Sequence, residues 1–286
     1  MTKKHTLIIG CGYLGRRVAK LLLHENGRVS ALTRSESTAA AFAEQGIEPL
    51  LGDVMRPESL TFPDVDALVY AVGFDRTSSY SKHETYVTGL ANVLDRAPTV
   101  RSFVYVSSTS VFGQTDGEWV HEDSPTEPAT DGGKICLEAE NLLQNRVPNA
   151  CIVRLAGIYG PNRLLRKVAA LKNSEPISGN PDAHLNLIHV DDAARLVTQL
   201  SSAPTTESVY LGCDGEPLTR RAFYEELCGL VGAAEPTFDP GLPTRNSATG
   251  VNKRCRSTQL AALPFEFEFP TAREGLVQAV RESDVV

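Results

Sequence analysis

Short apolar runs alternate with amphipathic stretches along most of the chain. The runs lie at 6–9, 28–32, 47–51, 67–71, 102–107, 151–155 and 208–212. The stretches between them include 84–94 and 135–146, which carry apolar residues at helical spacing. The run at 67–72 has no polar alternation, as expected of a parallel strand buried on both faces. The pattern predicts an α/β fold, a Rossmann-type doubly wound parallel sheet.

The pattern changes in two later segments, 161–185 and 213–286. Both are richer in Pro, Gly and Asn, and their helical patterns are shorter. They are expected to form a small irregular C-terminal substrate cap. We predict a dinucleotide-binding Rossmann domain over 1–157 and 186–212, and the cap over 158–185 and 213–286.

The chain begins with a strand, a glycine-rich turn and a helix. The run 6–9 is followed by Gly10, Gly12 and Gly15 in a Gly-x-Gly-x-x-Gly motif, and Leu14 starts the apolar helix face. The first glycine permits the turn, the second lets a pyrophosphate approach, and the third lets the helix pack on the strand. We expect this loop, including Tyr13 and Leu14, to bind a dinucleotide; the alternative is a purely structural turn.

The end of the second strand favours NADP(H) over NAD(H). NAD sites place an Asp or Glu about twenty residues beyond the glycine loop to bind the ribose 2′-hydroxyl. Here the chain has Thr33, Arg34 and Ser35. A guanidinium and two hydroxyls suit a 2′-phosphate. In the alternative interpretation, Arg34 is a solvated loop residue and Glu36 reaches the ribose.

Composition limits the classes of partner and compartment. The chain has 286 residues, 42% hydrophobic and 22% charged, with a net charge of −7. This charge argues against nucleic acid or an anionic membrane as the main partner. No signal peptide or membrane span is expected. The six cysteines form no Cys-x-x-Cys pair and no zinc-like cluster, so we expect reduced thiols, no metal and a cytoplasmic protein. Cys11, at a helix N-terminus, is either a redox-sensitive thiol or a small loop residue.

Five further segments follow strands in a recognisable order. They are Gly52-Asp53-Val54, Ala71-Val72-Gly73, 106–113, 154–161 and 188–193. Together with the glycine loop, they resemble an extended short-chain dehydrogenase/reductase of the NAD-dependent epimerase/dehydratase type. The resemblance covers nearly the whole chain.

The resemblance implies roles for several of these residues. Asp53 and Val54 would hold the adenine, Ala71 to Gly73 would line the cofactor, and Ser108 would bond the reacting oxygen of the substrate. The segment 188–192 would be mainly architectural, so His189 is not expected to act as a base. Plainer alternatives are that Asp53 caps a short helix and that Ser108 is only a turn hydroxyl.

The resemblance fails at one catalytic position. Family members carry a tyrosine four residues before a lysine; here the lysine is Lys134 and the earlier residue is Thr130. Lys134 would still bind the nicotinamide ribose, but a threonine hydroxyl ionises too weakly to replace the tyrosine. Losing a general acid or base costs about 10²–10⁴-fold in rate. Asp131, His121 and Tyr159 are candidate substitutes, among which the sequence does not choose.

Two functions remain open. One is an atypical NADP-dependent oxidoreductase or epimerase acting on a small polar substrate such as a nucleotide sugar, with Ser108, Thr130 and Lys134 at its active site. The other is a non-catalytic NADP(H)-binding protein with a regulatory or redox-sensing role. Arg163, Arg166 and Lys167 either face an anionic substrate or lie on a solvated helix face. A homodimer through 84–94 and 135–146 is a further expectation from the family.

Overall fold

The computed structural model describes residues 3–203, 205–239, 241–242 and 250–284. Parts of the predicted cap segment 213–286 therefore lie outside the described residues. The chain forms two compact units. The first unit comprises Met1–Ser108, Asp131–Arg154 and Ala194–Tyr210, and the second comprises Thr109–Thr130, Leu155–Ala193 and Leu211–Val286. These units differ from the predicted domain boundaries chiefly at 109–130 and 186–193, which group with the second unit.

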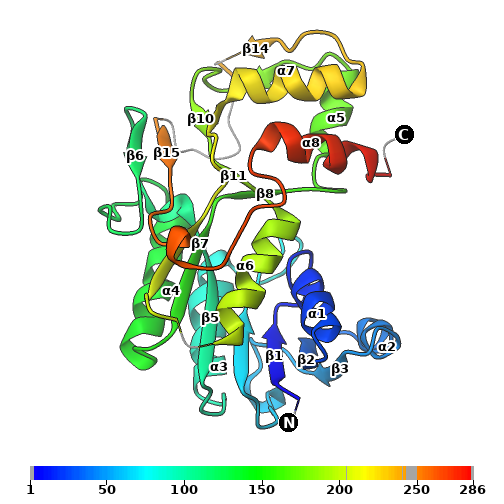
Figure 1. The fold of residues 1–286 in the computed structure, drawn as a ribbon, viewed down its shortest axis with the longest axis vertical. Helices are drawn as coiled ribbons and strands as arrows, with labels where there is room; N and C mark the ends of the chain where they lie inside the picture. The colour runs from blue at the N-terminus through cyan, green and yellow to red at the C-terminus, as the bar shows by residue number, and fades with distance from the viewer. Residues whose placement is uncertain (1–2, 204, 240, 243–249, 285–286) are drawn as a thin grey trace. The chain divides into compact units, whose positions relative to one another are not determined.

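A seven-stranded sheet forms the centre of the first unit, in the order β12-β7-β5-β4-β1-β2-β3 (Figure 1). Its strands are β1 (His5–Ile9), β2 (Arg28–Thr33), β3 (Glu48–Leu51), β4 (Ala67–Tyr70), β5 (Ser102–Ser108), β7 (Cys151–Leu155) and β12 (Val209–Gly212). Strand β1 pairs in parallel with β2 and β4, β2 with β3, and β4 with β5. The strand order reverses between β1 and β4, the arrangement of a doubly wound sheet. The predicted fold class is confirmed.

The strands form where the sequence is apolar over a short run. All five residues of β1 and all four of β4 are buried, because helices cover both faces of the sheet. The one polar ring within β1 has a partner: His5 Nε2 lies 2.8 Å from Ser30 Oγ on β2. Burial with a hydrogen bond explains why histidine is tolerated there.

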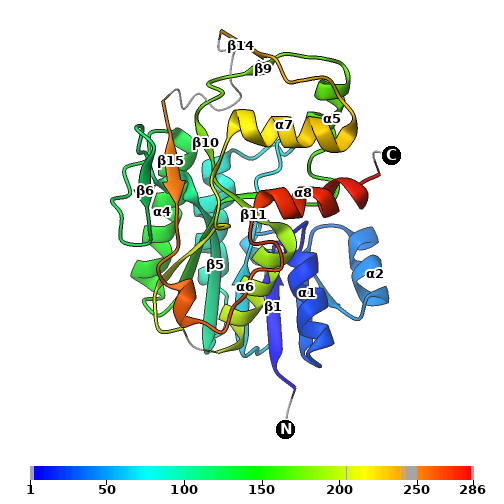
Figure 2. The ribbon, with the colours of Figure 1, turned by 45° about the horizontal axis from the view of Figure 1, so that its top comes forward.

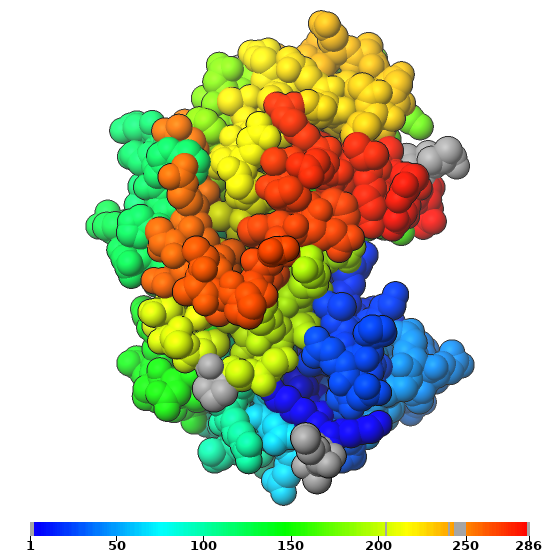
Figure 3. Space-filling view, in the orientation of Figure 1, coloured from blue at the N-terminus to red at the C-terminus, as the bar shows by residue number. Residues whose placement is uncertain are grey.

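Helices cover the sheet on both faces. They are α1 (Gly15–His24), α2 (Glu36–Glu44), α3 (Gly89–Leu94), α4 (Asp131–Arg146) and α6 (Val190–Ser202). The views show α1 and α6 on one face and α3 and α4 on the other (Figures 1 and 2). The outer sides of α1 and α2 lie side by side on the surface (Figure 3). Among the described residues, no helix has the length and apolar character needed to cross a bilayer.

The predicted helix 84–94 is not uniform. It begins as a π-helix, Glu84–Thr88, and continues as α3. The helix predicted around 135–146 begins earlier, at Asp131. Both elements contribute apolar residues such as Leu90, Val93 and Leu143 to the core under the sheet.

The second unit is built from short elements. Its strands are β6 (Glu118–Val120), β8 (Gly157–Tyr159), β9 (Ile177–Ser178), β10 (His184–Leu185), β11 (Leu187–His189), β13 (Leu218–Thr219), β14 (Phe238–Asp239) and β15 (Lys253–Cys255). They pair as β10–β13, β11–β8, β14–β9 and β15–β6. Its longer helices are α5 (Leu165–Lys172), α7 (Arg220–Val231) and α8 (Ala272–Arg281), and single 3₁₀ turns lie at Pro57–Ser59, Thr109–Val111 and Leu260–Ala262 in the two units. The three helices share one apolar core with β8 and β11.

A buried ion pair connects α4 to the sheet in the first unit. Arg154 of β7 donates to Glu140 of α4 at 2.8 Å, and both side chains are buried. Ser107 of β5 donates to the same carboxylate at 2.5 Å. The carboxylate therefore has both charge compensation and hydrogen bonds, the condition under which a buried charge is tolerated.

Replacing Glu140 with alanine is expected to lower the free energy of unfolding by about 3–5 kcal/mol, because the buried guanidinium of Arg154 would lose the carboxylate that compensates its charge. Chemical denaturation measures the change. The matched control is Glu138→Ala on the same helix, whose exposed pair with His83 contributes less than about 1 kcal/mol. Equal losses for the two variants would contradict this account of the ion pair.

A second buried carboxyl, Asp214, lies in the second unit without full compensation. Its Oδ1 accepts the N–H of Glu216 at 3.3 Å, while Oδ2 has no partner among the described residues. Burial raises the pKa of Asp214 to about 8. The folded state therefore holds a proton that the unfolded chain, with a pKa of about 3.9, releases.

Between pH about 4 and about 8 the folded state binds more protons than the unfolded state, so stability falls as the pH rises. We expect a fall on the order of a few kcal/mol across this window, and a flatter profile for Asp214→Asn. Unfolding free energies measured at several pH values test it. Asp182→Asn, at an exposed carboxylate, should keep the slope of the unmodified protein. A slope unaffected by Asp214→Asn would be the contrary result.

Candidate functional site

Parallel register brings the ends of four strands of the first unit together. Ile9 of β1 pairs with Leu32 of β2 and Tyr70 of β4. Thr33 in turn pairs with Leu51 of β3. The residues that follow these positions, among them Gly10, Arg34, Gly52 and Ala71, therefore lie along one sheet edge. This edge is at the switch point, where ligands of open α/β sheets bind.

Two of the three glycines in the loop have no room for a side chain. Gly10 has φ +95°, and a Cβ there would collide with the backbone of Ala71. A Cβ on Gly15 would lie 2.6 Å from the carbonyl oxygen of Gly10. At Gly12, by contrast, no atom lies within 4 Å of an added Cβ. The loop therefore packs tightly at its first and third glycines and leaves open space beside the second.

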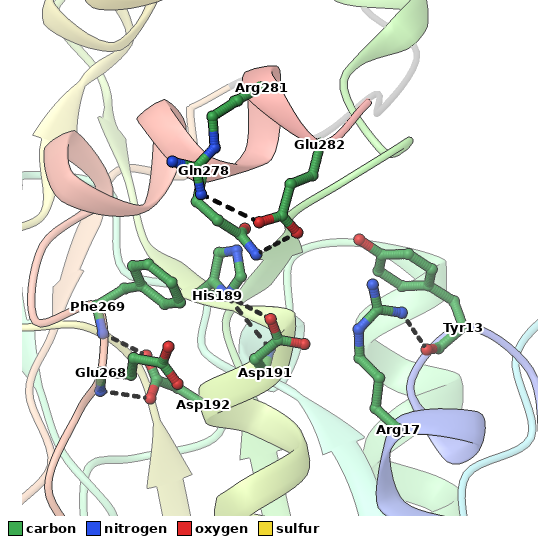
Figure 4. Close-up of polar contacts among 10 residues, drawn as sticks. All are labelled: Tyr13, Arg17, His189, Asp191, Asp192, Glu268, Phe269, Gln278, Arg281 and Glu282. Atoms are coloured by element: carbon green, nitrogen blue, oxygen red, sulfur yellow. Dashed lines mark hydrogen bonds and ion pairs between the residues drawn. The ribbon is translucent and has the colours of Figure 1, made fainter. Parts of the chain in front are cut away.

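The N-terminus of α1 faces this loop without a capping side chain. Leu14 occupies the cap position and is buried, and no side chain among the described residues caps the helix. Arg17 folds back on Tyr13, donating to its carbonyl oxygen at 3.0 Å with the guanidinium 4.4 Å from the ring centre (Figure 4). An uncapped helix N-terminus beside open backbone suits an anion such as a pyrophosphate.

The three residues after β2 have different environments. Ser35 caps α2, its hydroxyl accepting the N–H of Thr38 at 3.2 Å. Thr33 Oγ1 accepts the N–H of Ser35 at 3.3 Å. Arg34 is 56% exposed, and its guanidinium lies 3.6 Å from the carboxylate of Asp75. The hydroxyls are thus occupied locally, whereas Arg34 presents its charged group at the surface.

Asp53 and Val54 follow β3. Asp53 Oδ1 accepts the N–H of Met55 at 2.9 Å, which stabilises a local turn. The 3₁₀ turn Pro57–Ser59 has Arg56 at its cap position, so Asp53 does not cap that helix. Val54 packs on the core, and its carbonyl accepts the amide of Asn92 at 2.8 Å. The loop is therefore fixed by contacts at both residues.

The two predicted segments at the ends of β4 and β5 belong to neighbouring strands. Tyr70 pairs with Tyr105 in the register of β4 and β5. Gly73 and Ser108 each come three residues after these tyrosines. Gly73 has no atom within 4 Å of an added Cβ, and Ser108 is half-buried. Open backbone and a hydroxyl thus follow neighbouring strands.

Lys134 faces solvent. Its side chain is 65% exposed and lies 3.6 Å from the carboxylate of Asp131, which is almost fully exposed. The buried face of α4 instead carries Gly133, Cys136 and Glu140, among others. Thr130 precedes α4, is half-buried and belongs to the second unit. The roles of Lys134 and Thr130 remain predictions, but the side chain of Lys134 lies off the buried face.

The other candidate proton donors lie in the second unit. Tyr159 is buried against His189, their ring centres 5.1 Å apart, and its hydroxyl has no partner among the described residues. Burial raises the pKa of Tyr159 well above its ordinary value. His121 is half-exposed and accepts the N–H of Asp123 at 3.3 Å. Tyr159 is therefore part of the core, and His121 is a surface residue of a tight turn.

The segment around His189 connects helices and strands within the second unit. Asp192, at the start of α6, accepts the N–H groups of Glu268 at 2.7 Å and Phe269 at 2.9 Å (Figure 4). His189 is fully buried, and its ring centre lies 4.1 Å from that of Phe269. These contacts fit an architectural role. Lys167, one of the three cations predicted to meet a substrate, donates to the hydroxyl of Tyr224 at 3.2 Å.

Cys11 is buried in the glycine loop. Burial raises the pKa of its thiol to about 11, an effect larger than the opposing charge of Arg16. The thiol is therefore protonated at neutral pH, which does not favour a redox-sensitive thiolate. All six cysteines of the chain are buried and free of disulfides.

Two polar groups near the predicted cofactor edge were not identified from the sequence. Asp75 pairs with Arg34, and Tyr86 of the π-helix accepts the N–H of Phe74 at 3.2 Å. Tyr86 lies within the stretch 84–94, whose helical spacing alone gave no reason to separate it from its apolar neighbours. The only signal in the sequence was that this run contains a tyrosine, whose hydroxyl could form a hydrogen bond.

A protein-family model and a protein of similar length match this chain. The model of the NAD dependent epimerase/dehydratase family matches residues 6–211. Protein YeeZ of Escherichia coli strain K12 is 29% identical over 281 residues, covering 93% of this chain and 97% of that protein.

Two solved structures are also similar. A structure described as a putative NAD-dependent epimerase/dehydratase from Methylobacillus flagellatus has 31% identity and a TM-score of 0.76, covering 98% of each chain. The UDP-glucose 4-epimerase of Thermotoga maritima, solved with UDP-glucose, has 17% identity and a TM-score of 0.78, covering 97% of this chain and 98% of that chain. The second likeness concerns the fold alone.

Substitutions at Gly12 and Gly15 should separate binding from stability. Gly15→Ala is expected to cost about 1–3 kcal/mol of unfolding free energy, because its methyl would overlap the Gly10 carbonyl. Gly12→Ala should change stability by less than about 0.5 kcal/mol and weaken NADPH binding about tenfold or more. Thermal unfolding and calorimetric titration measure the two effects. Unweakened NADPH binding by Gly12→Ala would argue against a pyrophosphate beside this glycine.

Proposed function

Since this chain belongs to the NAD dependent epimerase/dehydratase family, we propose that it is an NADP-dependent oxidoreductase or epimerase acting on a small polar substrate. The observation that carries the proposal is the open backbone at Gly12 beside the uncapped N-terminus of α1. Together they offer N–H groups and space for a pyrophosphate. Asp53 and Ala71 to Gly73 lie along the same edge and would complete the dinucleotide site.

The preference for NADP rests on Arg34. A guanidinium at the surface after β2 offers paired N–H donors to a 2′-phosphate. Its present partner, the carboxylate of Asp75, is itself nearly half-exposed and 3.6 Å away, so a dianionic phosphate would compete with it. The neutral 2′-hydroxyl of NAD would not form a comparable charge-assisted contact with this guanidinium.

The substrate class proposed is a nucleotide sugar or a similar small polar carbonyl or alcohol. The UDP-glucose 4-epimerase of similar fold supports this class only by analogy. Ser108 would bond the reacting oxygen, because it ends β5, the strand beside β4, and the open backbone of Gly73 lies in the loop that follows β4. A homodimer through α4 and the segment 84–94, and a cytoplasmic location, complete the proposal.

The alternative is an NADP(H)-binding protein without hydride transfer. The exposed position of Lys134 and the threonine at 130 favour it, because together they leave the family's usual proton relay absent. The two functions share the cofactor site and differ in turnover. Loading the protein with NADP⁺ and adding UDP-glucose would give the absorbance of reduced nicotinamide only in the first case.

Arg34→Ala is expected to weaken binding of NADPH by about 10–100-fold, since a charge-assisted contact contributes about 1.5–3 kcal/mol. Binding of NADH should change by less than about threefold. Calorimetric titration with both cofactors measures the two constants. Arg96→Ala, which removes an exposed arginine following α3, is the control and should leave both unchanged. A parallel loss for NADPH and NADH would contradict a contact with the 2′-phosphate.

A further inference from the structure

Tyr86 is a phenol that contacts the loop following β4. It is part of the π-helix Glu84–Thr88, and its side chain is half-buried. The hydroxyl accepts the N–H of Phe74 at 3.2 Å. Phe74 directly follows Gly73, the last residue predicted to line the cofactor. The phenol is thereby held at the carboxyl end of β4.

The loop that contacts Tyr86 follows the strand beside that of Ser108. Tyr70 and Tyr105 are register partners on β4 and β5, with ring centres 5.7 Å apart. Phe74 lies four residues beyond the first tyrosine, in the loop after β4, and Ser108 lies three residues beyond the second, at the end of β5. Tyr86 therefore contacts the segment that leaves β4, the strand next to the one that ends at Ser108.

A lysine accompanies the phenol. Lys82 lies four residues before Tyr86, and its Nζ is 5.3 Å from the ring centre. The same ammonium donates to the carbonyl oxygen of Gly132, in the first turn of α4, at 3.3 Å. Lys82 is half-buried, whereas Lys134 is exposed beside Asp131. Lys82 is thus the cation that lies beside the ring of Tyr86.

The π-helix accounts for this placement. A π-turn widens the helix by one residue, and such turns occur often at functional sites. Here the widened turn packs against α4 and precedes Gly89, whose added Cβ would lie 3.0 Å from Val54. The segment is therefore held between α4 and the loop after β3, and Tyr86 has a fixed position.

We propose that Tyr86 is the proton donor and acceptor of this protein, and that Lys82 positions it and stabilises its phenolate. This proposal rests on the oxidoreductase function proposed above. In reduction, the substrate carbonyl carbon receives a hydride from the dihydronicotinamide, and its oxygen receives the proton of Tyr86. The products are an alcohol, the oxidised nicotinamide and a phenolate, which regains its proton from solvent. Oxidation of an alcohol runs the same steps in reverse.

The surroundings of Tyr86 fit both protonation states. Burial raises the pKa of Tyr86, an effect that the N–H of Phe74 partly offsets. The free protein therefore holds the phenol protonated at neutral pH, ready to donate. When the proton leaves, the N–H of Phe74 stabilises the negative oxygen directly, and the ammonium of Lys82, 5.3 Å from the ring centre, places a positive charge nearby.

A titration of tyrosine ionisation by ultraviolet difference absorbance tests the position of Tyr86 directly. The positive charge of the oxidised nicotinamide should lower the pKa of a nearby phenol, so NADP⁺ should shift one tyrosine to lower pH and NADPH should not. The shift should be absent in Tyr86→Phe and present in Tyr80→Phe, a control from the preceding loop. A shift that persists in Tyr86→Phe, or no shift while NADP⁺ binds, would overturn the proposal. Failure to bind NADP⁺ would instead refute the proposed function.

Turnover of UDP-glucose by the NADP⁺-loaded protein gives a second test. Tyr86→Phe should slow hydride transfer by about 10²–10⁴-fold with unchanged cofactor affinity. Lys82→Met should give a smaller loss and move the pH profile of the rate to higher pH, a displacement that a purely structural lysine would not cause. Tyr80→Phe should transfer hydride at the unmodified rate. Full activity of Tyr86→Phe would refute the assignment, and if UDP-glucose is not turned over, the tyrosine titration decides.

Discussion

The close approach of Gly10 to the backbone of Ala71 is the contact on which the site depends. It joins the ends of β1 and β4, the two strands at which the winding of the sheet reverses. Because the chain has no side chain at Gly10, the loop turns sharply, α1 begins beside it, and space remains at Gly12. The segment that begins at Ala71 continues to Phe74, whose N–H donates to Tyr86. The cofactor edge and the proposed proton donor are therefore connected through the first residues after β4.

Helix α4 has a buried face that stabilises the fold and an outer face that is exposed to solvent. Its buried face holds Glu140 against Arg154, and its outer face carries Lys134 and Glu138. At its first turn, the carbonyl of Gly132 accepts the ammonium of Lys82. Lys82, which does not occupy the position of the family's lysine, thus contacts the start of this helix from another element. In the family, the catalytic tyrosine and lysine are four residues apart near one helix. Here the proposed pair, Tyr86 and Lys82, would lie on one segment and contact a second helix, α4.

The sequence predicted the strands well, because each is a short apolar run buried on both faces. It also predicted the glycine loop, in which Gly10 and Gly15 leave no room for a Cβ and Gly12 leaves open space. The π-helix was beyond prediction: Tyr86 fits the helical spacing of 84–94 equally well with or without one extra residue in the turn. Spacing likewise placed Lys134 four residues after Thr130 but could not tell which face of α4 it occupies. The capping role of Ser35 depends on where α2 begins, a boundary that residue types define only loosely.

The central claim is that the first unit binds NADP(H) with its nicotinamide beside Tyr86, and a crystal structure of the complex with NADPH tests it most directly. We predict that the pyrophosphate lies beside Gly12 and that the 2′-phosphate contacts the guanidinium of Arg34. The Tyr86 hydroxyl should lie within about 3–4 Å of the position that the reacting substrate oxygen would occupy next to the nicotinamide C4. A nicotinamide bound beside Lys134, with Tyr86 remote from its ring, would contradict the account.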